Sequence, residues 1–142
     1  MNASRYLIFI PQQPKPKFHS VMKQADVFLD TIGFSGFNTA MQAVECNLPI
    51  VTCEGRFMRG RFAGAILKRM EMKELVCRDK GAYVKLAVKI AKNSSYRESL
   101  RKKMSKSSHV LYRDKDAIQA LENFLIKIVE QSRGNLLNQA AL

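Results

Sequence analysis

The sequence has no run of about 18 apolar residues, the length that a helix needs to cross a bilayer. Residues 1–11 also lack the charged start, the long apolar middle and the small-residue cleavage site of a secretory signal. These two absences argue against a membrane-spanning helix and a secretory leader. We therefore expect a soluble, cytoplasmic protein that makes no contact with a membrane.

Cysteine is scarce, with only three widely spaced residues, Cys46, Cys53 and Cys77. Their number is odd, and no C-x-x-C or Cys/His spacing in the sequence suits a metal. Each lies in an apolar run, which is typical of a buried free thiol. We expect three free thiols and no metal, in agreement with a reducing compartment.

Basic residues are abundant, because 24 Lys and Arg stand against 12 Asp and Glu and give a net charge of +12. Such a surface attracts anions of every kind, including nucleic acids. The basic residues cluster at residues 56–69 and again at 97–106, and the second cluster is typical of a solvated helix face. Because no aromatic-basic RNA motif or helix-turn-helix pattern accompanies the charge, nucleic acid is not the expected partner.

A chain of 142 residues with 46% hydrophobic residues fits one domain. Apolar patterning predicts strands at 6–10, 26–30, 50–53 and 74–77. It predicts helices at 18–24, from 37 to the Asn47-Leu48-Pro49 break, at 59–70, after an Asp79 cap, after a Ser95-x-x-Glu98 capping box, and at 114–130. This alternation indicates the α/β class, with a Rossmann-like parallel sheet flanked by helices. We expect a domain at residues 1–131 and a flexible tail at 132–142.

Ligands of an open α/β sheet bind at the carboxyl ends of its strands, which selects the loops at 11–17, 31–38 and 54–60. In the second loop, glycines allow close approach, and the amides of residues 37–39 open a helix and so favour an anion. The segment is neither G-x-G-x-x-G nor a P-loop, so an ordinary glycine turn stays open as an interpretation.

The third loop contains Arg56, Arg59 and Arg61. Guanidinium groups suit phosphate because each presents several donors in a rigid fork. An exposed basic loop with no ligand would have the same composition, and the pattern alone does not decide between the two.

Taken in order, these segments resemble a known family. The similarity rests on Asp26-Val27-Phe28-Leu29-Asp30-Thr31, the small-residue turn into Asn38-Thr39, Asn47-Leu48-Pro49-Ile50-Val51-Thr52, and residues 55–61. They look like consecutive motifs of the O-linked N-acetylglucosamine transferases, particularly the SPINDLY-like branch, and order and spacing match from about residue 6 to 130. The resemblance implies a GT-B enzyme with two Rossmann-like domains facing a cleft, of which this chain is the C-terminal half.

The resemblance also implies a donor site. It places the phosphate-binding turn at Gly36, Phe37, Asn38 and Thr39, with Arg61 as a further phosphate contact. It places Lys15 and Phe18 beside the base, and Gln42 beside the ribose. Phe37 and Asn38 depart from the family's usual Gly or His followed by Thr, and Gln42 replaces an acidic residue.

The function implied is donor-nucleotide binding within an inverting glycosyltransferase, which transfers a sugar, N-acetylglucosamine from UDP-GlcNAc, to Ser or Thr hydroxyls of an acceptor protein. No metal or other cofactor is expected. The missing N-terminal domain, and helical repeats of the parent chain, would be partners, and the chain alone would be inactive. No residue stands out as a general base, because His19 and His109 read as surface or packing residues. The alternative is a non-catalytic scaffold or partner-binding module, which the residues at Phe37 and Gln42 favour.

Overall fold

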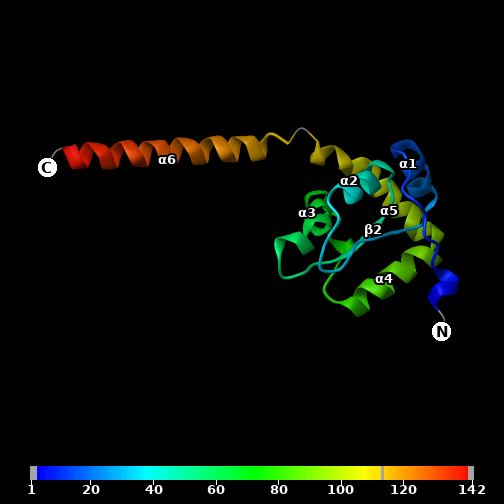
Figure 1. Cartoon of the computed structure of the whole chain (residues 1–142). Coiled ribbons are helices and arrows are strands. Elements are labelled where there is room, and N and C mark those ends of the chain that lie inside the picture. The colour runs from blue at the N-terminus through cyan, green and yellow to red at the C-terminus, as the bar shows by residue number, and fades with distance from the viewer. Residues whose placement is uncertain (1–2, 113, 141–142) are drawn as a thin grey trace. The chain divides into compact units, whose positions relative to one another are not determined.

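The computed structural model describes residues 3–112 and 114–140 and divides the chain into two compact units, Met1–His109 and Val110–Leu142. The first unit contains the sheet and the helices α1 to α5, and the second is built on the helix α6 (Figure 1). The candidate site lies in the first unit.

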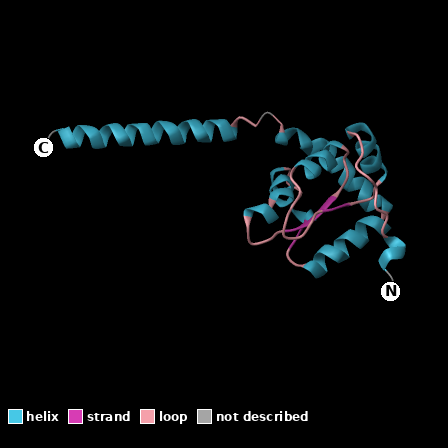
Figure 2. Cartoon of the chain, in the orientation of Figure 1, coloured by secondary structure: helices cyan, strands magenta, loops and turns pink. Residues whose placement is uncertain are grey.

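The sheet has three parallel strands in the order β1-β2-β3, formed by Phe28–Leu29, Ile50–Cys53 and Val76–Cys77. The central strand, β2, is rich in β-branched residues and is buried along its whole length. Figure 2 shows the strands running through the middle of the unit with helices around them. The predicted parallel sheet is confirmed. The strand predicted at 26–30 is shorter, because only Phe28 and Leu29 pair with β2, and Leu29, on this edge strand, is 53% exposed.

The strand predicted at residues 6–10 is wrong. A short 3-10 helix, η1, covers Ala3–Tyr6, and residues 7–14 form no regular element. These apolar side chains are exposed, and within residues 3–112 no backbone hydrogen bond joins residues 7–10 to a neighbouring strand. A β-type sequence becomes a strand only when an adjacent edge supplies hydrogen bonds, and none is supplied here.

Five helices surround the sheet: α1 (Lys15–Gln24), α2 (Asn38–Glu45), α3 (Phe62–Arg69), α4 (Lys80–Lys92) and α5 (Ser94–Ser107). Short 3-10 turns, η2 (Met58–Gly60), η3 (Lys73–Leu75) and η4 (Ser108–Leu111), join or end them. Helices α2, α3 and α4 contact β2 and cover it. The core is formed by Leu48, Ile50, Leu67, Met70, Met72, Leu75, Ile90 and Met104.

Helix boundaries show where local rules succeed and where they fail. Helix α1 begins at Lys15, earlier than predicted, because Pro14 is its N-cap and Pro16 lies in the first turn, where a missing N–H breaks no helical bond. The predicted Asp79 cap is confirmed, since its carboxylate accepts a 2.8 Å bond from the amide of Ala82. The Ser95 capping box is wrong, because the cap of α5 is Asn93.

The second unit contains α6 (Asp116–Ala140). A helix was predicted at 114–130, and the structure continues it to Ala140. Residues 132–140, expected as a flexible tail, are therefore helical, and the domain boundary predicted at residue 131 falls inside α6. Across the described ranges, no helix combines the length and the apolar character that crossing a membrane would need.

Candidate functional site

Two loops meet where β1 and β2 end. The amide of Ser35, in the loop at 31–38, donates a 2.7 Å hydrogen bond to the carbonyl of Arg59, in the loop at 54–60. Gly60 is buried between them, and a Cβ there would lie 3.3 Å from the Cα of Gly55 and 3.5 Å from the carbonyl oxygen of Gly33. These two of the three loops selected from the sequence therefore lie side by side, and glycine at position 60 permits their close approach.

A buried carboxylate fixes the shape of the loop at 31–38. Asp30, which is 3% exposed, accepts hydrogen bonds from the hydroxyls of Ser35 and Thr52, both at 2.7 Å, and from the amide of Gly36 at 2.9 Å. Three donors compensate the carboxylate for the water that it loses on burial. The Ser35 hydroxyl also accepts a 2.8 Å bond from the amide of Ala63 in the first turn of α3. One charge thus joins β1, β2, the loop and α3.

Tyr83 attaches α4 to the same place, because its hydroxyl donates a 2.9 Å hydrogen bond to the backbone carbonyl of Asp30. Burial raises the pKa of the Tyr83 phenol, and the carboxylate of Asp30 raises it further. The structural roles of Asp30, Ser35, Thr52 and Tyr83 were not predicted from the sequence. The available signal was an aspartate at a strand end followed five residues later by Ser-Gly.

The start of α2 is open to solvent. Phe37, Asn38 and Thr39 are all exposed, and no side chain caps the helix. In residues 3–112, the amides of Asn38 and Thr39 have no hydrogen-bond acceptor. The amide of Gly36, in contrast, is used by Asp30. The arrangement leaves donors at a positive helix end, which is the chemistry that an anion requires.

Two further features shape this turn. The Thr39 hydroxyl lies over Gly36, so that a Cβ at position 36 would collide with it. The ring of Phe37 packs edge-to-face on Phe62, with centroids 5.8 Å apart, yet Phe37 is still 53% exposed. Phe37 therefore packs against α3 and does not cover the N-terminal end of α2.

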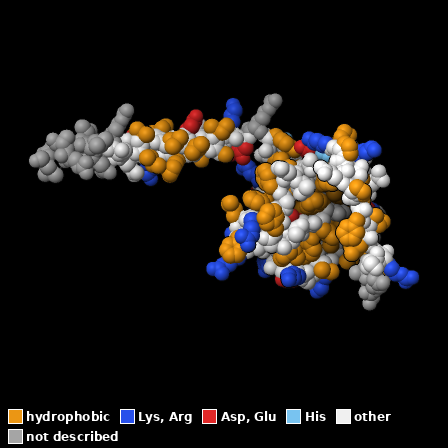
Figure 3. Space-filling model, in the orientation of Figure 1, with side chains coloured by type: hydrophobic (Ala, Val, Ile, Leu, Met, Phe, Trp, Pro, Cys, Tyr) orange, Lys and Arg blue, Asp and Glu red, His pale blue; other side chains and the backbone are white. Residues whose placement is uncertain are grey.

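The three arginines at residues 56–61 contact other residues of the same segment. The Nε atom of Arg61 donates a 2.8 Å bond to the carbonyl of Gly55, which closes the loop. The guanidinium groups of Arg56 and Arg59 lie 5.8 Å and 4.9 Å from the ring centre of Phe57. Figure 3 shows Lys and Arg side chains at several separate places on the visible face of the first unit. The positive charge is distributed in patches.

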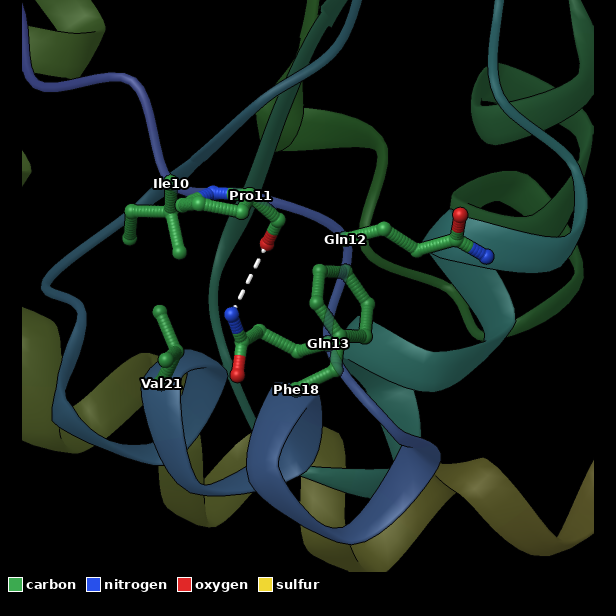
Figure 4. A pocket seen from close by; sticks show the side chains of 6 residues that line it. All are labelled: Ile10, Pro11, Gln12, Gln13, Phe18 and Val21. Atoms are coloured by element: carbon green, nitrogen blue, oxygen red, sulfur yellow. Dashed lines mark hydrogen bonds between the residues drawn. The ribbon is translucent and has the colours of Figure 1, made fainter.

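A cavity of about 240 Å³ lies between α1 and the segment that precedes it. It is lined by Ile10, Pro11, Gln12, Gln13, Phe18 and Val21 (Figure 4). The side-chain amide of Gln13 donates a 2.9 Å bond to the carbonyl of Pro11, and the half-buried ring of Phe18 stands beside it. An aromatic face, aliphatic walls and a few amide groups suit a flat heterocycle.

The structure groups the predicted site residues only in part. Phe18 lines the cavity with the segment at 12–13, but Lys15 is exposed and Gln42 half-buried, and neither lines it. All three cysteines are free and buried, as predicted. In the described part of the chain, no three His, Cys, Asp or Glu side chains are grouped as ligands for a metal ion.

Comparison with known proteins places these features in a family. Residues 1–120 match the family model of glycosyl transferase family 41. The chain belongs to this family. It is 31% identical over 87 residues to the UDP-N-acetylglucosamine–peptide N-acetylglucosaminyltransferase of Giardia intestinalis, covering 61% of this chain and 6% of that protein. It is 33% identical over 86 residues to a probable SPINDLY enzyme of Petunia hybrida, covering 58% of this chain and 9% of that one.

The fold agrees with a solved structure. A mutant O-GlcNAc transferase of Thermobaculum terrenum matches with a TM-score of 0.70 and 28% identity, over 80% of this chain and 22% of that one. The α/β, Rossmann-like half of a GT-B glycosyltransferase predicted from the sequence is confirmed. This family 41 chain spans less than a tenth of the length of the curated relatives described here.

Proposed function

We propose that this chain binds the nucleotide diphosphate of a sugar donor, UDP-N-acetylglucosamine, within a protein O-glycosyltransferase. The observation that supports the proposal is the exposed start of α2, where the amides of Asn38 and Thr39 have no acceptor among the described residues. The diphosphate binds there, and the base occupies the cavity beside Phe18. The names of the relatives described above, UDP-N-acetylglucosamine–peptide N-acetylglucosaminyltransferases, support this choice of donor.

In such a reaction a Ser or Thr hydroxyl of the acceptor attacks the anomeric carbon, and the nucleotide diphosphate departs with inversion. Negative charge grows on the leaving phosphate in the transition state. The α2 amides, fixed by the helix, and the guanidinium of Arg61, held by its bond to Gly55, stabilise that charge because they are in place before the reaction, and the side chains of Asn38 and Thr39 add hydrogen bonds. The hydroxyl proton needs a base, and we assign none to this chain. The acceptor side belongs to another domain.

The test is a calorimetric titration of UDP into the chain, comparing the wild type with Asn38→Ala/Thr39→Ala. A hydrogen bond to a charged group contributes about 1.5–3 kcal/mol, so the affinity should fall roughly tenfold or more. Ser94→Ala/Ser95→Ala is the matched control, because it makes the same type of change in the exposed first turn of α5. Equal affinities for both double variants would contradict the contacts of the Asn38 and Thr39 side chains with the diphosphate, whereas the backbone amides are retained in alanine.

One observation favours the scaffold alternative. The ring of Phe37 packs on Phe62 directly beside the α2 amides and, with the exposed Phe34 and Phe57, makes this rim more apolar than a phosphate site requires. A module that uses this rim to bind a protein partner would take up no UDP. Absence of heat in the wild-type titration would therefore support the scaffold and reject the donor site.

A further inference from the structure

Exposed apolar and arginine side chains gather on the two loops beside the start of α2. We call them the loop surface, which consists of Phe34, Arg56, Phe57, Met58 and Arg59. Met58 is 76% exposed, Phe34 67% and Phe57 58%. Figure 3 shows hydrophobic side chains intermixed with Lys or Arg at the edge of the first unit where η2 lies. Aromatic residues, Met and Arg are the residues that are enriched at protein interfaces.

Although it is exposed, the loop surface is held in a fixed shape. The amide of Gly55 donates a 3.0 Å hydrogen bond to the carbonyl of Gly60, and the amide of Gly60 donates one of 2.9 Å to the carbonyl of Phe57. The contacts of Arg56 and Arg59 with the ring of Phe57 restrain the two guanidinium groups as well. A surface that is formed in advance loses little conformational entropy when a partner binds.

The loop surface is positively charged and lacks a counter-charge. Glu54 is the only carboxylate in the sequence of the two loops, and it bonds to the ammonium of Lys68 at 2.6 Å. Among the described residues, no carboxylate lies within ion-pair distance of Arg56 or Arg59. Charge complementarity therefore requires acidic groups in the partner, and the exposed rings and thioether require apolar ones.

The position of the loop surface indicates which partner reaches it. Ser35 is three residues before Asn38, the first residue of α2, and three residues span at most about 11 Å. The amide of Ser35 lies 2.7 Å from the carbonyl oxygen of Arg59, so the loop surface begins about 10–15 Å from the α2 amides. In the proposed reaction, the acceptor hydroxyl must reach a sugar whose diphosphate binds at those amides. The acceptor chain therefore passes the loop surface, although its base and its other contacts belong to another domain.

We propose that the loop surface binds the acceptor polypeptide through a stretch of acidic and apolar residues, about three to five residues from the modified Ser or Thr. The spacing follows because an extended chain rises about 3.3 Å per residue, so that this number of residues spans the separation from the α2 amides. The inference rests on the proposed function. An Arg-aromatic surface also suits the bases of a nucleic acid, but the reaction brings a protein to this place.

The first test measures binding of a short fluorescein-labelled peptide by fluorescence anisotropy. The peptide contains one serine and, about four residues away, the alternation Asp-Leu-Asp-Leu. Arg56→Glu/Arg59→Glu should weaken its binding roughly tenfold, because two attractions are lost and two repulsions replace them. Lys102→Glu/Lys106→Glu is the matched control, since it makes the same change of net charge on the exposed face of α5. Its affinity should stay within about twofold of the wild type.

The second test addresses the apolar half of the contact without changing the charge. Met58→Ser should weaken peptide binding by about threefold, because part of an apolar side chain is no longer buried. Val84→Ser, at a 58% exposed position of α4, is its control and should bind as the wild type does. Because every substitution is at an exposed residue, all variants should keep the wild-type urea midpoint.

The third test measures the spacing. A photoreactive benzoylphenylalanine in place of the serine of the peptide should label residues 31–42, where the loop leads into α2. Labelling confined to another part of the chain would overturn the proposed placement of the acceptor hydroxyl. Mass spectrometry of the digested product locates the label.

Three results would overturn the acceptor role itself. Equal losses in the two charge-reversal variants, or equal binding of a peptide with Lys in place of Asp, would show attraction by net charge alone. Tighter binding of an oligothymidylate than of the peptide, lost in Arg56→Glu/Arg59→Glu, would assign the surface to nucleic acid. UDP binding by the wild type without peptide binding would reject the loop surface and leave the donor site standing. Peptide binding without UDP binding would instead reject the donor site, and with it the acceptor role.

Discussion

The hydroxyl of Ser35 donates a 2.7 Å hydrogen bond to the carboxylate of Asp30, five residues earlier in the chain. The same hydroxyl accepts the amide of Ala63, so that the loop between β1 and α2 is fixed to α3 as well as to the sheet. The carboxylate also accepts a hydrogen bond from the amide of Gly36, a residue that lies just before the exposed start of α2. The shape of the turn therefore depends on a buried charge as much as on its glycines.

Asp30→Asn should destabilise the protein strongly. An amide in place of the carboxylate turns an N–H₂ group toward donors that need an acceptor, and the cost should be roughly 3 kcal/mol of unfolding free energy. Urea denaturation measures the loss. Asp79→Asn is the control, because Asp79 is an exposed cap and asparagine caps a helix equally well. Similar losses in the two variants would show that Asp30 has no special role.

Phe18→Ala should reduce discrimination among bases more than it reduces affinity for the diphosphate. Removal of the ring enlarges the cavity, so that the larger purine of ADP should fit nearly as well as a pyrimidine, and the preference for UDP over ADP should fall roughly tenfold. Parallel calorimetric titrations with the two nucleotides give the ratio. Phe124→Ala removes an exposed ring from α6, outside the cavity, and should leave the ratio unchanged. An unchanged ratio in Phe18→Ala would place the base elsewhere.

Sequence patterns predicted those elements that are specified locally. The four residues of β2 are apolar or β-branched and fully buried, and Asp79 caps α4 through a contact three residues away. Residues 6–10 have the same strand-like composition as β2, but whether they pair depends on a neighbouring edge that composition does not reveal. Local rules could predict which segments are able to form a strand or a helix cap, but not which other segments they would contact.

The candidate site shows the same division. The glycines and the amides at the start of α2 were predicted from the sequence, because a helix start after a glycine turn is a local feature. The bond from Thr52 to Asp30 joins residues 22 positions apart and depends on the pairing of β1 with β2. Arg61 was predicted as a phosphate contact, and the structure shows that its Nε is already used to close its own loop. Such contacts follow only from the tertiary arrangement.

Tyr83→Phe should destabilise the protein by about 1 kcal/mol at neutral pH, because it removes the bond to the Asp30 carbonyl. Burial raises the pKa of Tyr83 in the folded protein, so the phenol is held in its neutral form. Its contribution is complete below the pKa of an unfolded tyrosine and is lost as the pH rises through the raised value. We therefore expect the difference in unfolding free energy between the wild type and Tyr83→Phe to be smaller above pH 10 than at pH 7. Denaturation of both proteins at the two pH values measures it. Tyr6→Phe, at an exposed ring, should change neither value.

The three cysteines should react slowly with iodoacetamide in the folded protein. Cys46, Cys53 and Cys77 are buried, and burial raises the pKa of both Cys46 and Cys77, which lowers the fraction of reactive thiolate at pH 8. Reaction then requires local or global opening, so each thiol should be labelled at least about 100-fold more slowly than an exposed one. Ser95→Cys supplies that reference, since residue 95 is exposed. Mass spectrometry over time measures all four rates, and urea should equalise them. Native rates close to that of the introduced thiol would show that the core around β2 and β3 opens far more readily than its packing indicates.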